Sequence, residues 1–560
     1  MMNVLDFYQK FLNADSTERN KMLNDLRHLD GNTEVNFVTD IFEKVFGNLE
    51  KDAIIYLNTE KNEEKRISYV ELIKGYNKFI NFLRNEGIKK GSTIYIMAGA
   101  IPEQWIVMMG ALKAGYTVIP TAPNLTEYEI RFRFSSDPPD VVVSDLQSAE
   151  KLEKSLVGKP LMLITGKKKG WISFNDMESM PGEAHGEILS VEDIFVKYFT
   201  SGTTGMPKAV QHSAVLYPLG QLSTVTAIGI KHDYIHCNLS SPGWAKFAWS
   251  SFFAPLCVGA TVLSIDYSGR LDAKNYLNII DKYGVNSFCA PPTAWRQFLS
   301  LKESGVSLNN LRETVSAGEP LNGEIISRWK NKYGTVLRDF YGQSESTAML
   351  ANLPGQKIIP GSMGIPLNSY HIALVDDDMN EITSPDTVGN MAVKDYRGTL
   401  GLFLGYSDSD KNNEVFINKY YLTGDRAYRD NDGHYYFVSR SDDVIKTSDY
   451  RVGPFEVESA IIKNEAVLES AVIGVPDPMK YEKIKAFVIL RNGYSADIET
   501  AKSIHDTVKS ILPYYKQPRI IEFTEELPKT ISGKIKRHEL REIERERRDN
   551  DVTVENEFHL

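Results

Sequence analysis

Residues 198–208, YFTSGTTGMPK, have the composition of a polyphosphate-binding loop. An apolar stretch, IFVKYF, leads into five hydroxyl or glycine residues that end at Gly205, with a proline and Lys208 directly after them. Glycines let backbone N–H groups converge on one point, hydroxyls donate further hydrogen bonds, and a lysine compensates negative charge. The P-loop pattern GxxxxGK[ST] is absent from the chain. The segment predicts phosphate binding; a plain surface loop is the alternative, because Ser, Thr and Gly are common in loops.

Three further segments carry groups that suit a nucleotide. In residues 339–345, DFYGQSE, an aromatic ring before glycine can face a base, and a hydroxyl next to Glu345 suits a phosphate and its Mg²⁺, which prefers oxygen ligands. Asp425, in TGD, is a carboxylate that can bind ribose hydroxyls, with Arg440 downstream. Residues 528–537, PKTISGKIKR, form a basic loop that can reach an anionic substrate. Each segment has an alternative interpretation. Residues 339–345 could form a strand-to-helix turn with an N-cap serine, Asp425 could be a simple turn aspartate, and residues 528–537 could be a solvated basic loop.

Three other patterns do not predict a site. HDYIH (232–236) has Asp where zinc proteases have Glu, and the surrounding YIHCNLSSP favours a strand rather than a helix. DNDG (430–433) would place Tyr428 and Ser439 at the ends of a calcium loop, so it is interpreted as a hairpin turn. GxSxG is absent, which leaves no candidate for a hydrolase serine.

The elements that must position these residues follow an α/β pattern. Apolar runs of strand length alternate with helical patterns through most of the first 400 residues, for example a strand at 92–99, a helix at 102–115 and a strand at 116–123. This alternation is typical of βαβ units and largely parallel sheets. From about Ala373 the pattern changes to short strands and turns, typical of an antiparallel barrel or meander.

A second domain is predicted after the polar segment 439–446, with a boundary near 440–443. Its elements are a helix at 455–467 and strands at 470–476 and 485–491. The stretch 537–551 is interpreted as a helix whose charges form a solvated face, with pairs such as Glu544 and Arg548.

Composition narrows the class of protein. The chain has 560 residues, 64 basic and 74 acidic, a net charge of −10, and 42% hydrophobic residues. Its length suggests two or more domains, and its acidity argues against general nucleic-acid binding. Cys237, Cys257 and Cys289 match neither a disulfide framework nor a zinc site. The N-terminus lacks signal and transit patterns, and the most apolar stretch, 105–120, is too short to span a bilayer. A cytoplasmic protein without a membrane span is predicted.

Taken in order, seven segments resemble the adenylate-forming superfamily of acyl-CoA synthetases, luciferases and nonribosomal adenylation domains. They are YFTSGTTGMPKAVQHS, SAGEPL, DFYGQSES, YLTGD, SRSDDVIK, YRVGPFEVES and PKTISGKIKR, and the resemblance covers residues 35 to 541. Residues 241–262 and 446–459 are most similar to the medium-chain acyl-CoA synthetase branch. The resemblance implies an AMP-forming acyl-CoA synthetase. A carboxylate attacks the α-phosphate of MgATP to give acyl-adenylate and pyrophosphate, and CoA then takes the acyl group and releases AMP.

The resemblance also implies an architecture. A large N-terminal domain, 1–441, would contain two α/β sheet subdomains and a distorted antiparallel β-barrel. A small α+β C-terminal domain, 442–560, would be mobile about a hinge at Asp442 and carry the catalytic lysine. After adenylation this domain would swing and exchange the lysine loop for a face that guides CoA.

Residue roles follow from the same resemblance. Lys534 would bridge the carboxylate and the α-phosphate, Glu345 would hold Mg²⁺, and Arg451 would lie near the phosphates. Ser344 stands where the family usually has threonine and would contact the α-phosphate. The other ATP- and AMP-binding residues would be Thr200, Ser201, Gly202, Thr203, Thr204, Gly205, Lys208, Gly318, Glu319, Pro320, Asp339, Tyr341, Gly342, Gln343, Asp425 and Arg440.

The acyl and CoA sites follow in the same way. Acetate-specific relatives have tryptophan at Gly342, so glycine would leave room for a longer or branched acid, with Trp244 as a wall or gate. Acids from 2-methylbutyrate-like to about C10 are expected, because apolar pockets discriminate a methylene weakly. Ser448, Asp449 and Tyr450 would line the CoA path. Asp449 replaces a family glycine, and its side chain would narrow or re-route that path.

Two alternatives to this function remain. One is a related adenylating enzyme that uses an aromatic acid such as benzoate, or a carrier protein as acceptor; no carrier domain follows Arg541, which favours free CoA. The other is a non-catalytic nucleotide-binding regulator, which the presence of Lys534, Glu345 and the phosphate loop disfavours. The expected ligands are ATP, Mg²⁺, CoA and a small carboxylate, and a homodimer is one assembly that the resemblance allows.

Overall fold

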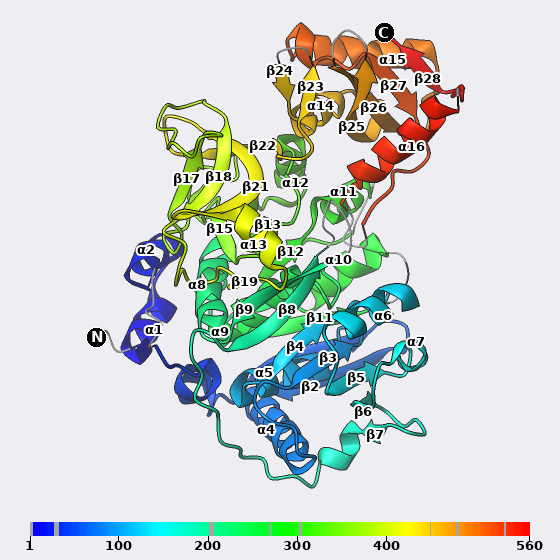
Figure 1. Ribbon diagram of the computed structural model, residues 1–560. Helices are drawn as coiled ribbons and strands as arrows, with labels where there is room; N and C mark the ends of the chain where they lie inside the picture. Colours follow the sequence, from blue (N-terminus) through cyan, green and yellow to red (C-terminus); the bar gives the residue numbers. More distant parts are fainter. Residues whose placement is uncertain are drawn as a thin grey trace. The chain divides into compact units, whose positions relative to one another are not determined.

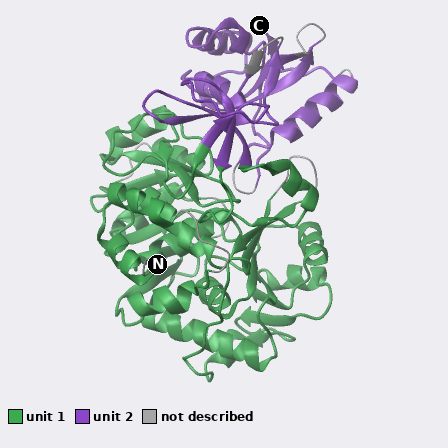
Figure 2. Ribbon diagram, turned by 60° about the vertical axis from the view of Figure 1, so that its left-hand side comes forward, with its two compact units in different colours: residues 1–372, 394–420 green, residues 373–393, 421–560 purple. Residues whose placement is uncertain are grey.

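The computed structural model describes residues 4–26, 33–200, 207–267, 269, 271–301, 305–447, 450–477, 481–530, 534–550 and 552–560. The chain forms two compact units, shown in Figure 2. The first contains residues 1–372 and 394–420, and the second contains residues 373–393 and 421–560. The boundary predicted near residue 441 lies inside the second unit.

The first unit contains a sheet of nine strands among the residues described. In spatial order these are β16 (Ile365–Pro366), β15 (Ala348–Ala351), β14 (Leu337–Gly342), β13 (Glu313–Ser316), β12 (Ser287–Ala290), β10 (Ile235–Asn238), β11 (Thr261–Asp266), β1 (Asp52–Asn58) and β2 (Glu63–Ser68). The strands from β14 to β1 are parallel, and β15, β16 and β2 are antiparallel additions at the edges. Their carboxyl ends therefore meet at one edge, where ligands bind in open α/β sheets.

The same unit contains an eight-stranded sheet. Its order is β19 (Gly405–Tyr406), β9 (Lys208–Ser213), β8 (Ile194–Thr200), β4 (Thr117–Pro120), β3 (Thr93–Met97), β5 (Val141–Asp145), β6 (Leu161–Thr165) and β7 (Ile172–Ser173). The predicted strand, helix and strand at 92–123 are confirmed as β3, α5 (Glu103–Ala114) and β4. Parallel pairing continues from β8 to β7, whereas β9 and β19 pair antiparallel.

Helices cover both sheets of this unit (Figure 1). Trp295 and Trp329 pack in one core with α10 (Ala273–Lys282), α11 (Pro292–Ser300) and α12 (Gly323–Tyr333) on a face of the nine-stranded sheet. The π-helix η4 (Phe247–Phe253) contacts its other face, with α8 (Leu216–Ile228) and α9 (Ala254–Cys257) beside it. α6 (Glu127–Ser136) and α7 (Ala149–Ser155) pack on the eight-stranded sheet. Further helices are α1 (Val4–Asn13), α2 (Ser16–Met22), α3 (Glu43–Phe46) and α4 (Tyr69–Asn85).

The second unit contains one sheet with an antiparallel β21–β22 pair and one mixed sheet. The first includes β17 (Ile372–Val375), β18 (Gly389–Lys394), β21 (Tyr420–Arg429) and β22 (Tyr435–Arg440). The predicted turn at 430–433 connects β21 to β22 and is confirmed. The mixed sheet contains β24 (Tyr450–Val452), β23 (Ile445–Thr447), β26 (Tyr481–Leu490), β27 (Ile520–Phe523) and β28 (Glu557–His559), with β25 (Val467–Asp477) paired to β26. α14 (Pro454–Ile461) and α15 (Ile498–Lys509) cover one core of this sheet, and α16 (Arg537–Asp549) covers another through Leu540.

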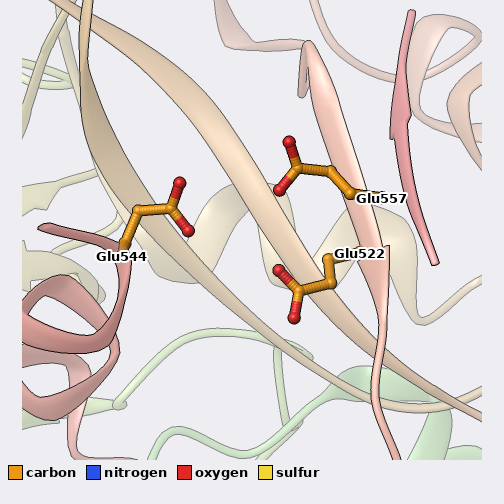
Figure 3. A group of neighbouring side chains, drawn as sticks. All are labelled: Glu522, Glu544 and Glu557. Atoms are coloured by element: carbon orange, nitrogen blue, oxygen red, sulfur yellow. The ribbon is translucent and has the colours of Figure 1, made fainter. Parts of the chain in front are cut away.

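The charged helix α16 differs from its prediction. Glu544 pairs with Arg548 at 3.1 Å as expected, but its side chain is buried. The Nζ of fully buried Lys485 lies 2.5 Å from Glu544 and 2.8 Å from Glu522, and it also bonds Glu557. Figure 3 shows the three carboxylates turned toward one another. The Lys485 ammonium bonds all three of them. The face predicted to be solvated therefore anchors α16 to the sheet through Lys485.

No helix in the described ranges is long and apolar enough to cross a bilayer.

Candidate active site

The residues after β14 form a tight turn at the carboxyl edge of the nine-stranded sheet. The chain turns at Gln343 and continues into antiparallel β15, so the alternative of a strand-to-helix turn is wrong. His212 of β9 contacts the carbonyl oxygen of Ser344 through Nε2 at 2.7 Å. Burial lowers the pKa of His212 to about 3, so the imidazole is neutral and Nε2 donates this bond. The position of Ser344 is thereby fixed from β9.

Glu345, the predicted Mg²⁺ ligand, is held by the segment 403–408. Its Oε1 accepts a hydrogen bond from Tyr406 Oη at 2.7 Å, and its carbonyl oxygen accepts one from the N–H of Phe403 at 2.9 Å. Tyr406 lies on β19, which pairs with β9. The carboxylate is half-buried and has a fixed direction, as an oxygen ligand for a hard cation requires.

The two ends of the predicted phosphate loop lie side by side. Thr200 is the last residue of β8 and Lys208 the first of β9, and these two residues are register partners. Thr200 Oγ1 donates to the carbonyl oxygen of Lys208 at 3.4 Å. Ser201, Gly202, Thr203, Thr204 and Gly205 lie outside the described residues.

Lys208 has an acidic partner that the sequence did not reveal. Its Nζ lies 2.7 Å from the carboxylate of Asp408, and both side chains are partly exposed. The hydrogen bond from Lys208 holds the pKa of Asp408 below its usual range. Asp408 also caps α13 (Ser409–Val415), where its Oδ1 accepts from the N–H of Asp410 at 3.0 Å.

Segment 403–408 thus contacts both Glu345 and Lys208. Its backbone pairs with β9, since Leu404 and Ser407 donate to carbonyl oxygens of Gln211 and Ala209 at 2.8 Å and 2.9 Å. The segment brings the predicted metal ligand and the predicted phosphate lysine to one edge. Tyr406 and Asp408 were missed because the letters GYSDSD match no phosphate pattern.

The predicted adenine residues come from β13 and β14. Gly318, Glu319 and Pro320 follow β13, and Gly318 has φ +100°, which glycine adopts at least cost. Asp339 is the register partner of Ser316 on the neighbouring strand. Its Oδ1 accepts a hydrogen bond from Asn352 Nδ2 at 2.7 Å, and burial raises its pKa to about 7. Tyr341, further along β14, is half-buried.

Gly342 allows the backbone of Thr347 and the side chain of Trp249 to lie close to β14. A Cβ at this position would lie 2.5 Å from the carbonyl oxygen of Thr347 and 3.2 Å from Cη2 of Trp249. The indole of Trp249, from η4, therefore fills space beside the glycine. Trp244, the other predicted pocket residue, is half-buried and packs against the core that includes Phe199.

The remaining predicted residues belong to the second unit. Asp425 and Arg440 are register partners on β21 and β22, and Arg440 Nη1 lies 3.4 Å from the buried carboxylate of Asp425. Arg440 Nε also lies 3.7 Å from the predicted hinge residue, Asp442. Lys534 is exposed, and its N–H donates to Thr530 Oγ1 at 3.0 Å.

The predicted CoA path is described only in part. Tyr450 and Arg451 belong to β24, whose backbone pairs with β23 so that Arg451 is the register partner of Lys446. Ser448 and Asp449 lie outside the described residues.

Comparison with known proteins assigns the chain to a family. Residues 42–407 match the model of the AMP-binding enzymes, and residues 456–534 match the AMP-binding enzyme C-terminal domain. The chain belongs to the AMP-binding enzyme family. It is 47% identical over 565 residues to 4-hydroxybutyrate–CoA ligase 1 of Metallosphaera sedula, with 100% of both chains covered. It is 36% identical over 495 residues to the mitochondrial acyl-coenzyme A synthetase ACSM3 of Rattus norvegicus, covering 86% of this chain and 85% of that one.

Solved structures of related AMP-binding enzymes have the same architecture as this chain. The anthranilate CoA ligase AuaEII in complex with anthranoyl-AMP matches with a TM-score of 0.83 and 27% identity, covering 93% of this chain and 99% of that one. A Brucella canis acyl-CoA synthetase matches with a TM-score of 0.69 and 29% identity, covering 97% and 99%. The predicted superfamily, medium-chain type and mixed α/β fold are confirmed. The chain is an AMP-forming acid–thiol ligase, for which ATP and CoA are fitting substrates.

Proposed function

We propose that this enzyme activates a small aliphatic carboxylate with MgATP to an acyl-adenylate and then transfers the acyl group to CoA. The observation that carries the proposal is the arrangement of Glu345 and Lys208 at one edge of the first unit, joined by segment 403–408. The first step brings a carboxylate into contact with a polyphosphate. Positioning and charge neutralisation must therefore supply most of the catalysis.

Each charged side chain has a role in this proposal. Lys208 leaves Asp408 and binds the β- and γ-phosphates with the preceding loop; a partly exposed ion pair is weak enough to exchange in this way. The fixed carboxylate of Glu345 fits Mg²⁺, which would offset the phosphate charge. Ser344 donates to the α-phosphate, and Lys534 bridges it to the attacking carboxylate. Asp425 and Arg440 bind the ribose.

The second half-reaction requires a different arrangement of the C-terminal residues. We propose that residues 442–560 rotate about Asp442 after adenylation, removing Lys534 and placing Ser448, Asp449 and Tyr450 along the CoA path. The contact of Arg440 with both Asp425 and Asp442 supports a hinge beside the ribose residues. The rotation would let one site close around ATP and later admit a thiol.

Lys534→Ala tests the separation of the two half-reactions. Adenylation, followed as AMP or pyrophosphate formation, is expected to fall at least about 10³-fold, because the bridging charge acts in that transition state. Thioester formation from supplied acyl-adenylate and CoA is expected to stay near the wild-type rate. An equal loss of both half-reactions would contradict the role of Lys534.

The acid is proposed to be aliphatic, from 2-methylbutyrate-like to about C10, because neighbouring chain lengths are weakly discriminated. The contact of Trp249 with Gly342 favours the shorter end of this range. A short hydroxy acid is a second candidate, because the Metallosphaera sedula relative is named a 4-hydroxybutyrate–CoA ligase. An aromatic acid or a carrier-protein acceptor is the alternative activity.

A reducing, cytoplasmic location and a homodimer are also proposed. The three cysteines are free and buried, as a reducing compartment allows.

A further inference from the structure

A network of buried polar side chains connects η4 to the nine-stranded sheet. His236 of β10 bonds Ser287 Oγ of β12 through Nδ1 at 2.9 Å and Ser250 Oγ of η4 through Nε2 at 3.0 Å. Burial lowers the pKa of His236 to about 3, so the network holds a neutral imidazole. None of the predicted nucleotide or CoA residues belongs to this network.

Asn238 lies at the carboxyl end of the same strand with one hydrogen-bonding atom unused. Its Nδ2 donates to Ser251 Oγ at 2.9 Å. Its Oδ1 is buried and accepts no hydrogen bond from any residue that the structure describes. Leaving such an oxygen unpaired costs about 1–3 kcal/mol, so native proteins rarely retain one without a reason.

A cationic side chain lies near Cys289, the register partner of Asn238. Asn238 and Cys289 are register partners on adjacent parallel strands, so their side chains share one face of the sheet. Burial raises the pKa of Cys289, whereas the nearby Lys246 ammonium and a hydrogen bond with Ser250 oppose that rise. Lys246 therefore reaches the same face from the residue before η4.

The network also lies next to the proposed acyl site. Trp249, which contacts the Gly342 position, directly precedes Ser250 of the network in η4. η4 thus contacts the Gly342 position through Trp249 and Asn238 through Ser251, so an acid that extends from Gly342 along η4 points toward Asn238. An alkyl terminus there would leave Asn238 Oδ1 unpaired and would further desolvate the ammonium.

We propose that the acyl site takes a short carboxylic acid whose far end carries a hydroxyl group. The hydroxyl donates to Asn238 Oδ1 and accepts from Lys246 Nζ, and few groups can do both. A terminal carboxylate cannot donate to the amide oxygen, and a methyl group can make neither bond. This inference rests on the proposed acyl-CoA synthetase activity and selects the substrate class within it.

The test compares acids of matched length in CoA-dependent AMP formation by the full-length enzyme. The pairs are 4-hydroxybutyrate with pentanoate and 5-hydroxypentanoate with hexanoate, and succinate provides a terminal carboxylate. The better hydroxy acid is expected to exceed its alkyl counterpart by about 10²-fold or more in kcat/KM, because a site built to bond a hydroxyl rejects the analogue that lacks it.

Two variants test whether Asn238 and Lys246 bind the hydroxyl group of the acid. Asn238→Leu is expected to lower the ratio of hydroxy to alkyl kcat/KM by at least about tenfold, through loss of hydroxy-acid activity. Lys246→Met keeps most of the aliphatic stem and is expected to lower the same ratio, so it serves if the first variant does not fold. Asn77→Leu is the matched control: Asn77 is also buried and hydrogen-bonded, to Lys113 and Gly182, so stability should fall while the ratio stays unchanged.

The outcomes separate this inference from the function on which it rests. A wild-type preference for alkyl acids or succinate, or an unchanged ratio in both variants, would overturn the hydroxyl site and leave the synthetase activity intact. Absence of AMP formation with every acid would instead contradict the proposed function.

Discussion

At the scale of single residues, the side chains proposed to bind phosphate and Mg²⁺ are positioned by residues that belong to no nucleotide-binding motif. Tyr406 bonds Glu345 across 61 residues of sequence, and Asp408 holds Lys208. The sequence predicted Glu345 and Lys208 because hydroxyls, glycines and charges cluster around them. It could not predict their partners, because strand pairing of β19 with β9 brings these residues together.

Tyr406→Phe tests the positioning of Glu345. The variant loses one hydrogen bond to a carboxylate but keeps the ring, which packs edge-on against Phe403 with centroids 5.0 Å apart. AMP formation is expected to fall about tenfold and to require more Mg²⁺ for half-maximal rate, since a bond to a charged group contributes about 1.5–3 kcal/mol. Tyr436→Phe, which removes a bond to Asp430 at 3.1 Å, is the control and should change neither quantity. Equal Mg²⁺ dependence in both variants would contradict the role.

Asp339 provides a test by pH. Its native pKa of about 7 lies above the ordinary value of 3.8, so the folded protein holds this proton more tightly than the unfolded chain does. The contribution of Asp339 to the free energy of unfolding therefore falls as pH rises from about 4 to about 7. In Asp339→Asn this loss should be absent, so the variant gains on the order of 3 kcal/mol relative to wild type between pH 4.5 and 8. Urea unfolding at both pH values measures the difference, and parallel profiles would contradict the assignment.

At the scale of elements, local sequence patterns predicted helices, strands and turns, but not the features that depend on distant parts of the chain. The strand, helix and strand from 92 to 123 and the hairpin at 430–433 follow from local pattern and turn residues. The turn at 343–347 and the buried charges of α16 do not, because each depends on a distant strand or side chain. The π-helix η4 was also missed, although it places Trp249 against Gly342.

Trp249→Ala should widen the proposed acyl site beside Gly342. The ratio of kcat/KM for octanoate to that for butyrate is expected to rise about tenfold, within the range of about 1–3 kcal/mol per methylene group. Stability should fall by about 3–5 kcal/mol, because a large buried side chain is removed. Trp295→Ala, on the other face of the same sheet, should lose similar stability without changing the ratio. If both variants leave the ratio at its wild-type value, Trp249 does not limit chain length.

At the scale of the whole molecule, the protein divides into two compact units with separate cores. The first contains Lys208, Glu345 and the proposed acyl site, and the second contains Lys534, Asp425 and Arg440. The C-terminal domain that we propose to rotate must remain rigid as it does so. The bonds of Lys485 to three glutamates join α16 to strands β26, β27 and β28 of the sheet and supply such rigidity.

Lys485→Met should destabilise the second unit selectively. Burial lowers the pKa of Lys485, but its hydrogen bonds to the glutamates raise it, and the net shift is upward. Removing this cation takes away the charge that three buried or half-buried carboxylates share, and only the arginines at their outer side remain for Glu522 and Glu544, so about 3–5 kcal/mol of stability should be lost. Calorimetry should then show an early transition for the second unit. Lys502→Met, at an exposed pair with Glu499, should melt like wild type. A single unshifted transition in Lys485→Met would contradict the anchoring role.

The proposed function requires acid activation and transfer to CoA to occur on one chain. The most direct measurement is AMP and acyl-CoA formation with a panel of C2 to C12, branched, hydroxylated and aromatic carboxylates, each with and without CoA. We predict CoA-dependent thioester formation that peaks at short aliphatic acids with a terminal hydroxyl group, together with pyrophosphate exchange without CoA. Pyrophosphate exchange without any thioester would contradict CoA as the acceptor, and the absence of both would contradict the proposed activity.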